Sequence, residues 1–255
     1  MNNTLSLRES VRYLSILVLV IVVMLYPDRL QFVLLISWIS IIIIDGNVRY
    51  LPFDNKPLYF MRMTLYFLPF ALPTLIFLNI KVEINAQTLI YCAVSVIAFC
   101  VWLLINFKSI KLTLSDLVIA NAPKENKYVM LLRAYNAVGS TVCEELFFRS
   151  FMLSLGIPFW ITILLSTVYF MLSHYTVPWG AQFSIGDIIN QLIFGTISAF
   201  LFLLSGSILP SIVLHLLLNS PTFARMVRVY NRHYVRATYY DKLLSAPDNL
   251  NNLTL

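Results

Sequence analysis

Long apolar runs separated by short polar segments make up most of this sequence. A helix that crosses the hydrocarbon core of a bilayer needs roughly 20 mostly apolar residues. Helices pair their backbone polar groups within the segment, which lipid requires. The pattern therefore predicts an all-α, polytopic membrane bundle of about eight helices. They are expected over residues 13–27, 30–45, 63–80, 86–107, 128–154, 157–175, 188–206 and 208–220.

The composition indicates that lipid surrounds much of the chain. Of the 255 residues, 59% are hydrophobic and 12% are charged, whereas about a quarter of the residues in soluble domains are charged. The net charge of +6 could point to nucleic acid, but the basic residues lie between the apolar runs and in the C-terminal tail. We therefore expect membrane lipids as neighbours and no nucleic-acid partner.

The distribution of lysine and arginine predicts the orientation of the bundle. With eight helices and a cytoplasmic N-terminus, Arg29 and Lys81 fall outside, Arg149 falls within a helix, and the remaining 15 of the 18 fall inside. The positive-inside rule then favours an N-in, C-in arrangement. Abundant isoleucine and asparagine indicate an AT-rich genome, so we expect an integral, multi-pass protein of a bacterial cytoplasmic membrane.

Charge also divides the chain into three predicted regions. Residues 1–124 would form four N-terminal helices without ionisable side chains in their interiors, followed by a cytoplasmic connector. Residues 125–222 would form a membrane core that does carry such side chains, and residues 223–255 a basic cytoplasmic tail.

The tail has a periodic basic pattern. Its arginines recur at spacings of 3, 4 and 4 residues, so one face of a helix there would be basic. We expect this face to lie on anionic headgroups; an acidic protein partner is the alternative. His233 is expected to be solvated.

Three short patterns place ionisable side chains inside the predicted helices of the second half. They are Glu144-Glu145-Leu146-Phe147-Phe148-Arg149, Phe170 with His174, and His215 with Asn219. An ionised side chain at the bilayer centre costs about 2.5–3.5 kcal/mol on insertion scales. These groups must therefore face a protein interior or a wet cavity.

Helical spacing predicts which side chains of these patterns share a helix face. Glu145 and Arg149 are four residues apart, so they can pair on one helix face. Glu144 is rotated by about 100° from Glu145, which leaves its carboxylate available for chemistry. His215 and Asn219 are also four residues apart and can reach into the same space.

Each pattern alone also has a structural interpretation. A histidine in a membrane helix often only hydrogen-bonds to a neighbouring helix, and a Glu–Arg pair can be a buried structural ion pair. Such groups also serve as proton relays in transporters. Two of the three histidines lie in the same half of the chain as the two adjacent glutamates, and this coincidence favours a functional site. In the predicted topology His174 and His215 both approach the cytoplasmic ends of their helices.

The chemistry that suits these residue types is water activation. A carboxylate and an imidazole together can position a water molecule and take its proton. Histidine and asparagine side chains can donate hydrogen bonds to the oxyanion of a tetrahedral intermediate. Peptide hydrolysis needs both functions. One glutamate and two histidines could instead bind a zinc ion with an open coordination position.

The three patterns, in this order and on separate helices, resemble the CAAX protease and bacteriocin-processing family, also called the CPBP or Abi family. Its pattern is Glu-Glu-x-x-x-Arg, then Phe-x-x-x-His, then His-x-x-x-Asn or a related residue, and this sequence matches all three over roughly residues 125–222. The family includes the type II CAAX prenyl endopeptidases. The resemblance implies a glutamate-dependent intramembrane endopeptidase acting on a peptide or a lipid-modified protein.

The resemblance also implies roles for individual residues. Glu144 would be the general base, with His174 helping to hold the water, and His215 and Asn219 would form the oxyanion hole. The supporting residues would be Glu145, Arg149 and Phe170. No cofactor is implied; the alternative is zinc held by Glu144, His174 and His215.

Two further functions are compatible with the same residues. A non-proteolytic membrane partner, such as a bacteriocin immunity or scaffold protein, would use the patterns only for its fold. A proton-coupled transporter would use the glutamates and histidines as a relay, but the sequence has no inverted repeat or pair of broken helices to support it.

Overall fold

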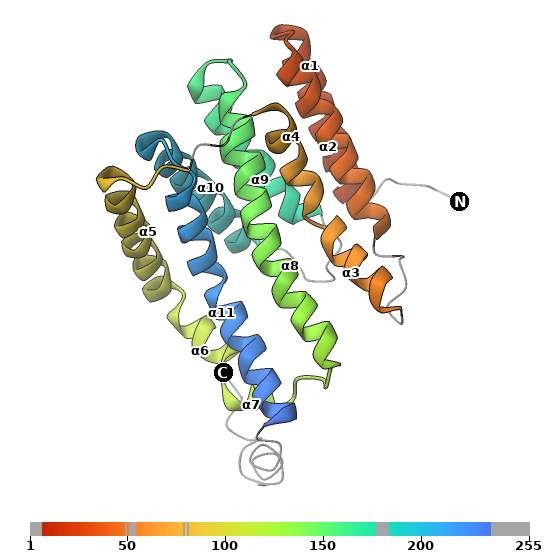
Figure 1. Cartoon of the computed structure of the whole chain (residues 1–255), viewed down its shortest axis with the longest axis vertical. Coiled ribbons are helices and arrows are strands. Elements are labelled where there is room, and N and C mark those ends of the chain that lie inside the picture. The colour runs from red at the N-terminus through yellow and green to blue at the C-terminus, as the bar shows by residue number, and fades with distance from the viewer. Residues whose placement is uncertain are drawn as a thin grey trace.

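The computed structural model describes residues 7–48, 50, 55–78, 80, 82–176 and 184–235, and every regular element in these ranges is a helix (Figure 1). The α-helices are α1 (Leu7–Leu25), α2 (Arg29–Val48), α3 (Lys56–Leu65), α4 (Leu68–Phe77), α5 (Ala86–Ile105), α6 (Phe107–Thr113), α7 (Asp116–Ala120), α8 (Lys127–Glu145), α9 (Phe159–Thr176), α10 (Ile185–Ser205) and α11 (Leu209–Tyr234). A π-helix, η1 (Leu146–Phe151), and a 3₁₀ turn, η2 (Met152–Ser154), follow α8.

The predicted all-α membrane bundle agrees with these helices. Within the described residues, three helices are long and apolar enough to cross a membrane, namely α2, α5 and α10, and the bent pair α3 and α4 makes a fourth if it is one span. Residues 159–175 of α9 form a shorter apolar helix. The apolar helices make this an integral membrane protein, while the number of eight spans stays a prediction.

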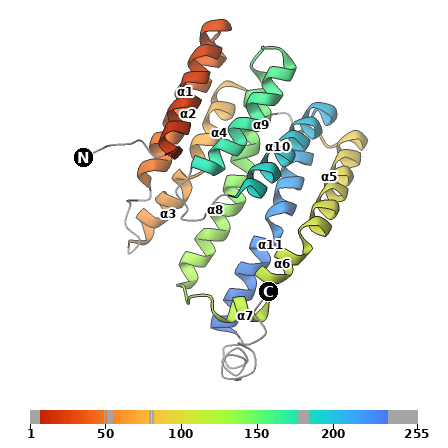
Figure 2. The same ribbon diagram turned by 180° about the vertical axis from the view of Figure 1, so that it is seen from behind.

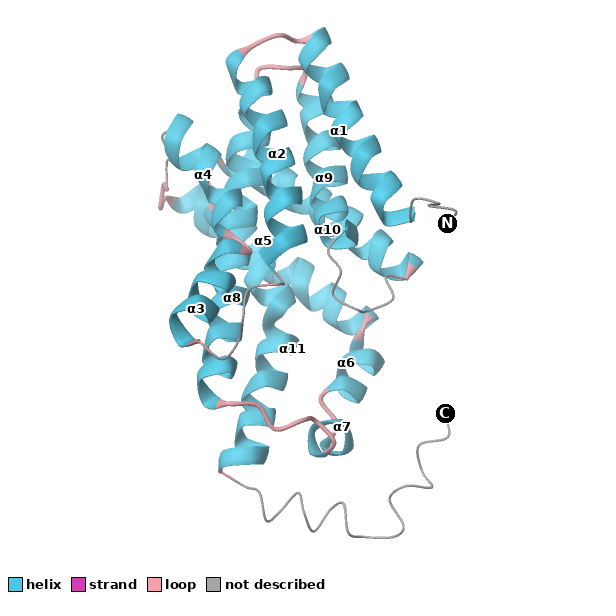
Figure 3. Ribbon diagram, turned by 90° about the vertical axis from the view of Figure 1, so that its right-hand side faces the viewer, coloured by secondary structure: helices cyan, strands magenta, loops and turns pink. Residues whose placement is uncertain are grey.

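Helix packing places α8 between two groups of helices. In Figure 1, α11 and α5 lie on one side of α8, and α3, α4, α2 and α1 lie on the other. Figure 2 shows from behind that α10 lies between α9 and α11, both of which it contacts. Figure 3 shows α6 and α7 at the end of the bundle where α11 finishes. The main hydrophobic core joins α1, α2, α4, η1, α9, α10 and α11.

The third predicted helix is two helices in the structure. The segment expected at 63–80 bends by 59° between α3 and α4. Pro69 lies in the first turn of α4, and because proline has no N–H it cannot donate to the carbonyl of Leu65. Phe67 fills the bend against Gly139 of α8, where an added Cβ would lie 2.6 Å from the Phe67 ring. Glycine therefore allows the bend to pack closely on α8.

The predicted helix 128–154 changes its winding halfway. It runs as α8 up to Glu145 and then as the wider π-helix η1. Phe147, Phe148 and Phe151 of η1 are fully buried, so the aromatic residues hold this segment in the core. Short π-helical segments occur frequently at functional sites.

The last helix is longer than predicted. The expected end was residue 220, but α11 continues through Pro221 to Tyr234 and passes the predicted boundary at residue 222. Arg228 forms an ion pair with Asp116 and also donates to the carbonyl of Leu114. Arg232 is buried and donates to the carbonyl of Ala120. These two arginines therefore hold the connector helix α7. The prediction of an exposed basic face is wrong for the buried Arg232, whereas the Arg228 side chain is 38% exposed.

His233 also differs from its prediction. It is partly buried, and its Nε2 lies 2.9 Å from the carbonyl oxygen of Ala122. Its expected solvation was therefore wrong. Arg236 and the rest of the predicted tail lie outside the described residues.

Candidate active site

One cavity of about 470 Å³ is lined by all four residues predicted to be catalytic. Glu144 reaches it from the end of α8, His174 from the end of α9, and His215 and Asn219 from α11. The three sequence patterns therefore meet in space although they lie on three different helices. The predicted supporting residues do not line the cavity and are buried in the protein interior; they are Glu145, Arg149 and Phe170.

Glu144 and His174 face each other across a short gap. Glu144 Oε2 lies 3.7 Å from His174 Nε2, which is too long for a direct hydrogen bond. No described residue forms a hydrogen bond with Glu144 Oε2, although this atom is buried. A water oxygen between the two atoms could reach both.

A backbone contact fixes the imidazole of His174. Its Nδ1 lies 3.0 Å from the carbonyl oxygen of Phe170, one helical turn earlier. A carbonyl oxygen only accepts hydrogen bonds, so Nδ1 carries the proton. In the neutral ring Nε2, the atom that faces Glu144, is then the acceptor.

Glu145 and Arg149 form a fully buried ion pair, as their spacing predicts. Arg149 Nε lies 3.2 Å from Glu145 Oε2, and both side chains are 0% exposed. Ser198 of α10 donates to the same carboxylate oxygen over 2.7 Å, and Arg149 donates to Ser166 of α9 over 2.7 Å. The pair thus joins the end of α8 and η1 to two other helices.

The buried Glu145–Arg149 pair also contacts one of the catalytic residues. The sequence did not predict this contact. His215 Nδ1 lies 2.9 Å from Glu145 Oε1. Because a carboxylate accepts, Nδ1 is the protonated nitrogen, and the Nε2 side of the ring remains for the cavity. Glu145 therefore orients His215 while it neutralises Arg149.

A chain of hydrogen bonds orients Asn219. Thr141 donates from its hydroxyl to the carbonyl of Ala137 over 2.9 Å. Its oxygen then accepts from the side-chain nitrogen of Asn219, also over 2.9 Å. This assigns the Asn219 nitrogen to the Thr141 side, and its second N–H is available to a ligand in the cavity.

Phe170 packs beneath the two histidines. It is fully buried, and its ring centroid lies 4.7 Å from that of His174 and 5.6 Å from that of His215. The Arg149 guanidinium lies over the same ring at 5.1 Å. Phe170 therefore keeps a fixed spacing between the ion pair and both imidazoles.

The expectation that the N-terminal helices lack ionisable interiors was wrong. Asp45 of α2 is 8% exposed and lines the same cavity, and it lies within electrostatic range of Glu144. Arg62 of α3 is also buried.

The only sequence feature that could have indicated Asp45 is its place as a single carboxylate directly after the apolar run Ile41–Ile44. The sequence could not indicate the hydroxyl residues of the site, because hydroxyl side chains are common in membrane helices. These residues are Thr141, Ser166 and Ser198.

The positions of the site residues also bear on the alternative prediction of a zinc site. Within the described residues, no group of three or more His, Cys, Asp or Glu side chains is arranged to hold a metal ion. Glu144, His174 and His215 share a cavity, and the bond from His215 Nδ1 to Glu145 leaves Nε2 on the cavity side. A ligating histidine often makes such a bond through its other nitrogen, so zinc stays the alternative, although the three side chains do not form a ready-made metal group.

Two further cavities adjoin the site on the side of α5 and α10. One of about 230 Å³ is also lined by His174, His215 and Asn219, together with Trp102. Trp102 also lines the second, an apolar cavity of about 240 Å³ between α5, α10 and α11. The site is therefore adjacent to an apolar space among membrane helices.

Comparison with known proteins links the chain to one kind of protease. A model of the family described as type II CAAX prenyl endopeptidase Rce1-like matches residues 126–221. This range contains all seven predicted site residues, and it leaves out helices α1 to α7, Asp45 and the end of α11. The match confirms the resemblance that the three sequence patterns indicated. No curated protein and no solved structure matched the chain.

Proposed function

From the family match and the geometry of the cavity, we propose that this chain is an intramembrane endopeptidase whose general base is Glu144. The observation that carries the proposal is the buried Glu144 oxygen without a described hydrogen-bond partner, 3.7 Å from the His174 imidazole. At the family level the match already implies a membrane protease of the CAAX type. The finer assignment of Glu144 as the base is supported by the sequence resemblance and by its position opposite His174.

The proposed first step is attack by an activated water. A water between Glu144 Oε2 and His174 Nε2 donates one hydrogen to each, because both atoms accept. Its lone pairs then point toward a substrate carbonyl in the cavity. Glu144 takes the proton as the water attacks, and later returns it to the leaving amine. His174 holds the water in the geometry of attack.

The oxyanion of the tetrahedral intermediate is proposed to bind at α11. Asn219 offers the N–H that Thr141 does not use. His215 can donate from Nε2 only as an imidazolium, because Nδ1 already carries the proton that faces Glu145. The ionised Glu145 stabilises this cation. Its bond to His215 is therefore a functional contact as well as a structural one.

The proposed substrate is a lipid-modified protein or peptide. The apolar cavity near α5 and α10 has a volume of about 240 Å³, and it joins the polar part of the site through Trp102. A lipid chain or an apolar side chain can occupy this space while the peptide reaches the histidines. Membrane burial of one end of the substrate would hold its scissile bond at the depth of the site.

We also propose a topology for this enzyme. The bundle would have eight spans with both termini in the cytoplasm, and residues 125–222 would be the catalytic core. Residues 1–124 would complete the cavity through Asp45, and residues 223–255 would follow in the cytoplasm. The excess of lysine and arginine in the predicted inside segments supports this orientation, and the composition supports a bacterial cytoplasmic membrane.

Asp45 is proposed to bind the substrate backbone. Asp45→Asn should raise KM about tenfold and change kcat by less than about threefold, because one of the two acceptor oxygens that can bind the substrate backbone is lost. Steady-state cleavage by the purified protein measures this. Asn47→Ala, an exposed position on the same helix, is the matched control and should behave as wild type. A loss confined to kcat would contradict the binding role.

The proposed function is tested by direct cleavage. Purified protein in detergent is incubated with lipid-modified peptides, with and without a chelator, and the products are identified by mass spectrometry. Wild type should hydrolyse an internal peptide bond in both conditions, and His215→Ala should be at least about 100-fold slower. Absence of cleavage by the wild type would instead favour the non-proteolytic partner. Loss of activity with the chelator would favour the metal alternative.

A further inference from the structure

The side of α8 that lines the catalytic cavity is polar for about two turns before Glu144. Asn136 and Ser140 line this cavity together with Glu144. The three residues follow one another at intervals of four, so they lie on the same face of the helix. Neither Asn136 nor Ser140 belongs to the three sequence patterns, and the proposed attack by water uses neither of them.

The bend between α3 and α4 fixes the amide of Asn136. Phe67 donates its N–H to the carbonyl of Thr64 over 3.2 Å, which leaves the carbonyl of Met63 without the donor that a continuous helix would provide. The side-chain nitrogen of Asn136 donates to the Met63 carbonyl over 2.9 Å. The amide oxygen of Asn136 therefore remains for the cavity, and none of the described residues donates to it.

Ser140 provides a second acceptor on this face. Its hydroxyl donates to the carbonyl of Ala137 over 3.3 Å, and no donor to its oxygen is found among the described residues. Ala137 also lines the cavity, and its methyl group occupies little space beside Asn136 and Ser140. The helix surface at the two acceptors can therefore accommodate a peptide main chain.

The spacing of the two acceptors matches an extended peptide. Four residues advance a helix by about 6 Å, and two residues advance an extended chain by about 6.6–6.8 Å. Each residue of an extended chain points its N–H and C=O groups to one side, and its neighbours point theirs to the other side. Ser140 and Asn136 can therefore accept from the N–H groups of two substrate residues that are two positions apart.

The oxyanion site sets the register of such a peptide. The scissile carbonyl points to α11, so the two adjacent residues point their N–H groups to α8. On the C-terminal side the adjacent residue contains the scissile nitrogen, which has to receive its proton from Glu144. The chain along α8 is therefore the N-terminal part of the substrate. Asn136 lies about 12 Å from Glu144 along the helix axis, and three extended residues cover about 10 Å, so the third residue before the scissile carbonyl reaches Asn136.

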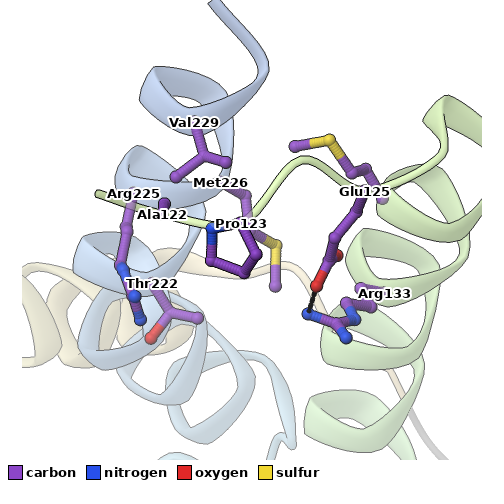
Figure 4. A pocket seen from close by; sticks show the side chains of 9 residues that line it. Ala122, Pro123, Glu125, Arg133, Thr222, Arg225, Met226 and Val229 are labelled. Carbon is purple, nitrogen blue, oxygen red and sulfur yellow. Dashed lines mark ion pairs between the residues drawn. The ribbon is translucent and has the colours of Figure 1, made fainter. Parts of the chain in front are cut away.

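The polar face of α8 leads toward a second cavity of about 190 Å³, where the connector after α7 meets α8 and the last turns of α11. Arg133, about one turn before Asn136, lines this second cavity, and Thr222 lines both cavities. Figure 4 shows Thr222 on α11, across from the ion pair of Glu125 with Arg133. A chain that follows α8 can therefore leave the catalytic cavity between α8 and α11.

We propose that this face of α8 binds the main chain of an extended substrate on the N-terminal side of the scissile bond. Ser140 accepts from the N–H of the residue directly before the one that supplies the scissile carbonyl, and Asn136 accepts from the N–H two positions earlier. The inference rests on the endopeptidase function proposed above. Both residues bind the main chain and take no part in bond cleavage, so they hold the substrate in register without selecting its side chains.

The test removes single N–H groups from the substrate. A lipid-modified peptide that wild type cleaves is prepared with an ester in place of one amide at a time, and positions are counted back from the residue that supplies the scissile carbonyl. Esters at the first and third positions should each raise KM about tenfold and change kcat by less than about threefold. Asn136→Ala should raise KM of the all-amide peptide about tenfold, and the ester at the third position should then add no further increase. Ser140→Ala should behave in the same way at the first position.

The controls are a third ester and a third variant. The ester at the second position should change KM by the same factor in wild type and in both variants, since its N–H points to α11. Val138→Ala alters an exposed residue of the same helix and should keep both ester effects. If Asn136→Ala and Ser140→Ala keep these effects, or wild type cleaves every ester like the amide, the binding site is wrong and the protease stands. If wild type cleaves no peptide, the proposed function fails and the binding site fails with it.

Discussion

Glu144→Gln is expected to lower kcat about a thousandfold and to leave the fold intact. Glutamine keeps the size of the side chain but cannot take a proton from water, and a general base contributes between about a hundredfold and ten-thousandfold. The stability should change little, because no described residue bonds to Glu144 Oε2. Initial rates of peptide cleavage, with thermal unfolding in the same detergent, measure both effects.

Glu83→Gln is the matched control for this prediction. It makes the same chemical change at a position before α5, away from the cavity, and it should keep the wild-type rate. KM of Glu144→Gln should stay within about threefold of wild type, since the lost group acts on the water. A variant that retains more than about a tenth of the wild-type kcat would exclude Glu144 as the base.

The sequence predicted the helical class and most of the site because these depend on local patterns. Apolar runs in lipid have to be helices, and four-residue spacings decide which side chains share a helix face. The pairing of Glu145 with Arg149 follows from spacing alone and is present at 3.2 Å. The meeting of three patterns in one cavity depended on the family resemblance, since separate helices have no fixed distance in sequence.

Features that depend on tertiary packing could not be predicted. Asp45 reaches the cavity only because α2 packs on α4 and the core, and one carboxylate in an apolar run does not reveal its neighbours. The length of α11 was missed because the predicted span ended with the apolar run at residue 220, whereas the helix continues through Pro221. Tolerance of proline inside a helix depends on surrounding contacts. The bond between His215 and Glu145 spans 70 residues, so no local spacing encodes it.

Arg149→Met is expected to destabilise the protein by about 3–5 kcal/mol, because it leaves the Glu145 carboxylate buried without its cation. This is a large part of the total stability of about 5–15 kcal/mol of a typical domain. Urea or thermal unfolding in detergent measures the change. Arg133→Met is the matched control. It breaks the ion pair with Glu125, in which the Arg133 side chain is 51% exposed and that of Glu125 is 23% exposed. The loss of this pair should cost at most about 1 kcal/mol.

The double variant Glu145→Gln with Arg149→Met separates structure from chemistry. Removing both charges should restore most of the lost stability, since no buried charge is then left without its partner. Activity should remain at least about 100-fold below wild type, because the introduced glutamine carries no charge to stabilise the His215 imidazolium that donates to the oxyanion. If stability and kcat recover together, Glu145 only neutralises Arg149. If stability alone recovers, the buried pair also sets the state of His215, as the 2.9 Å contact indicates.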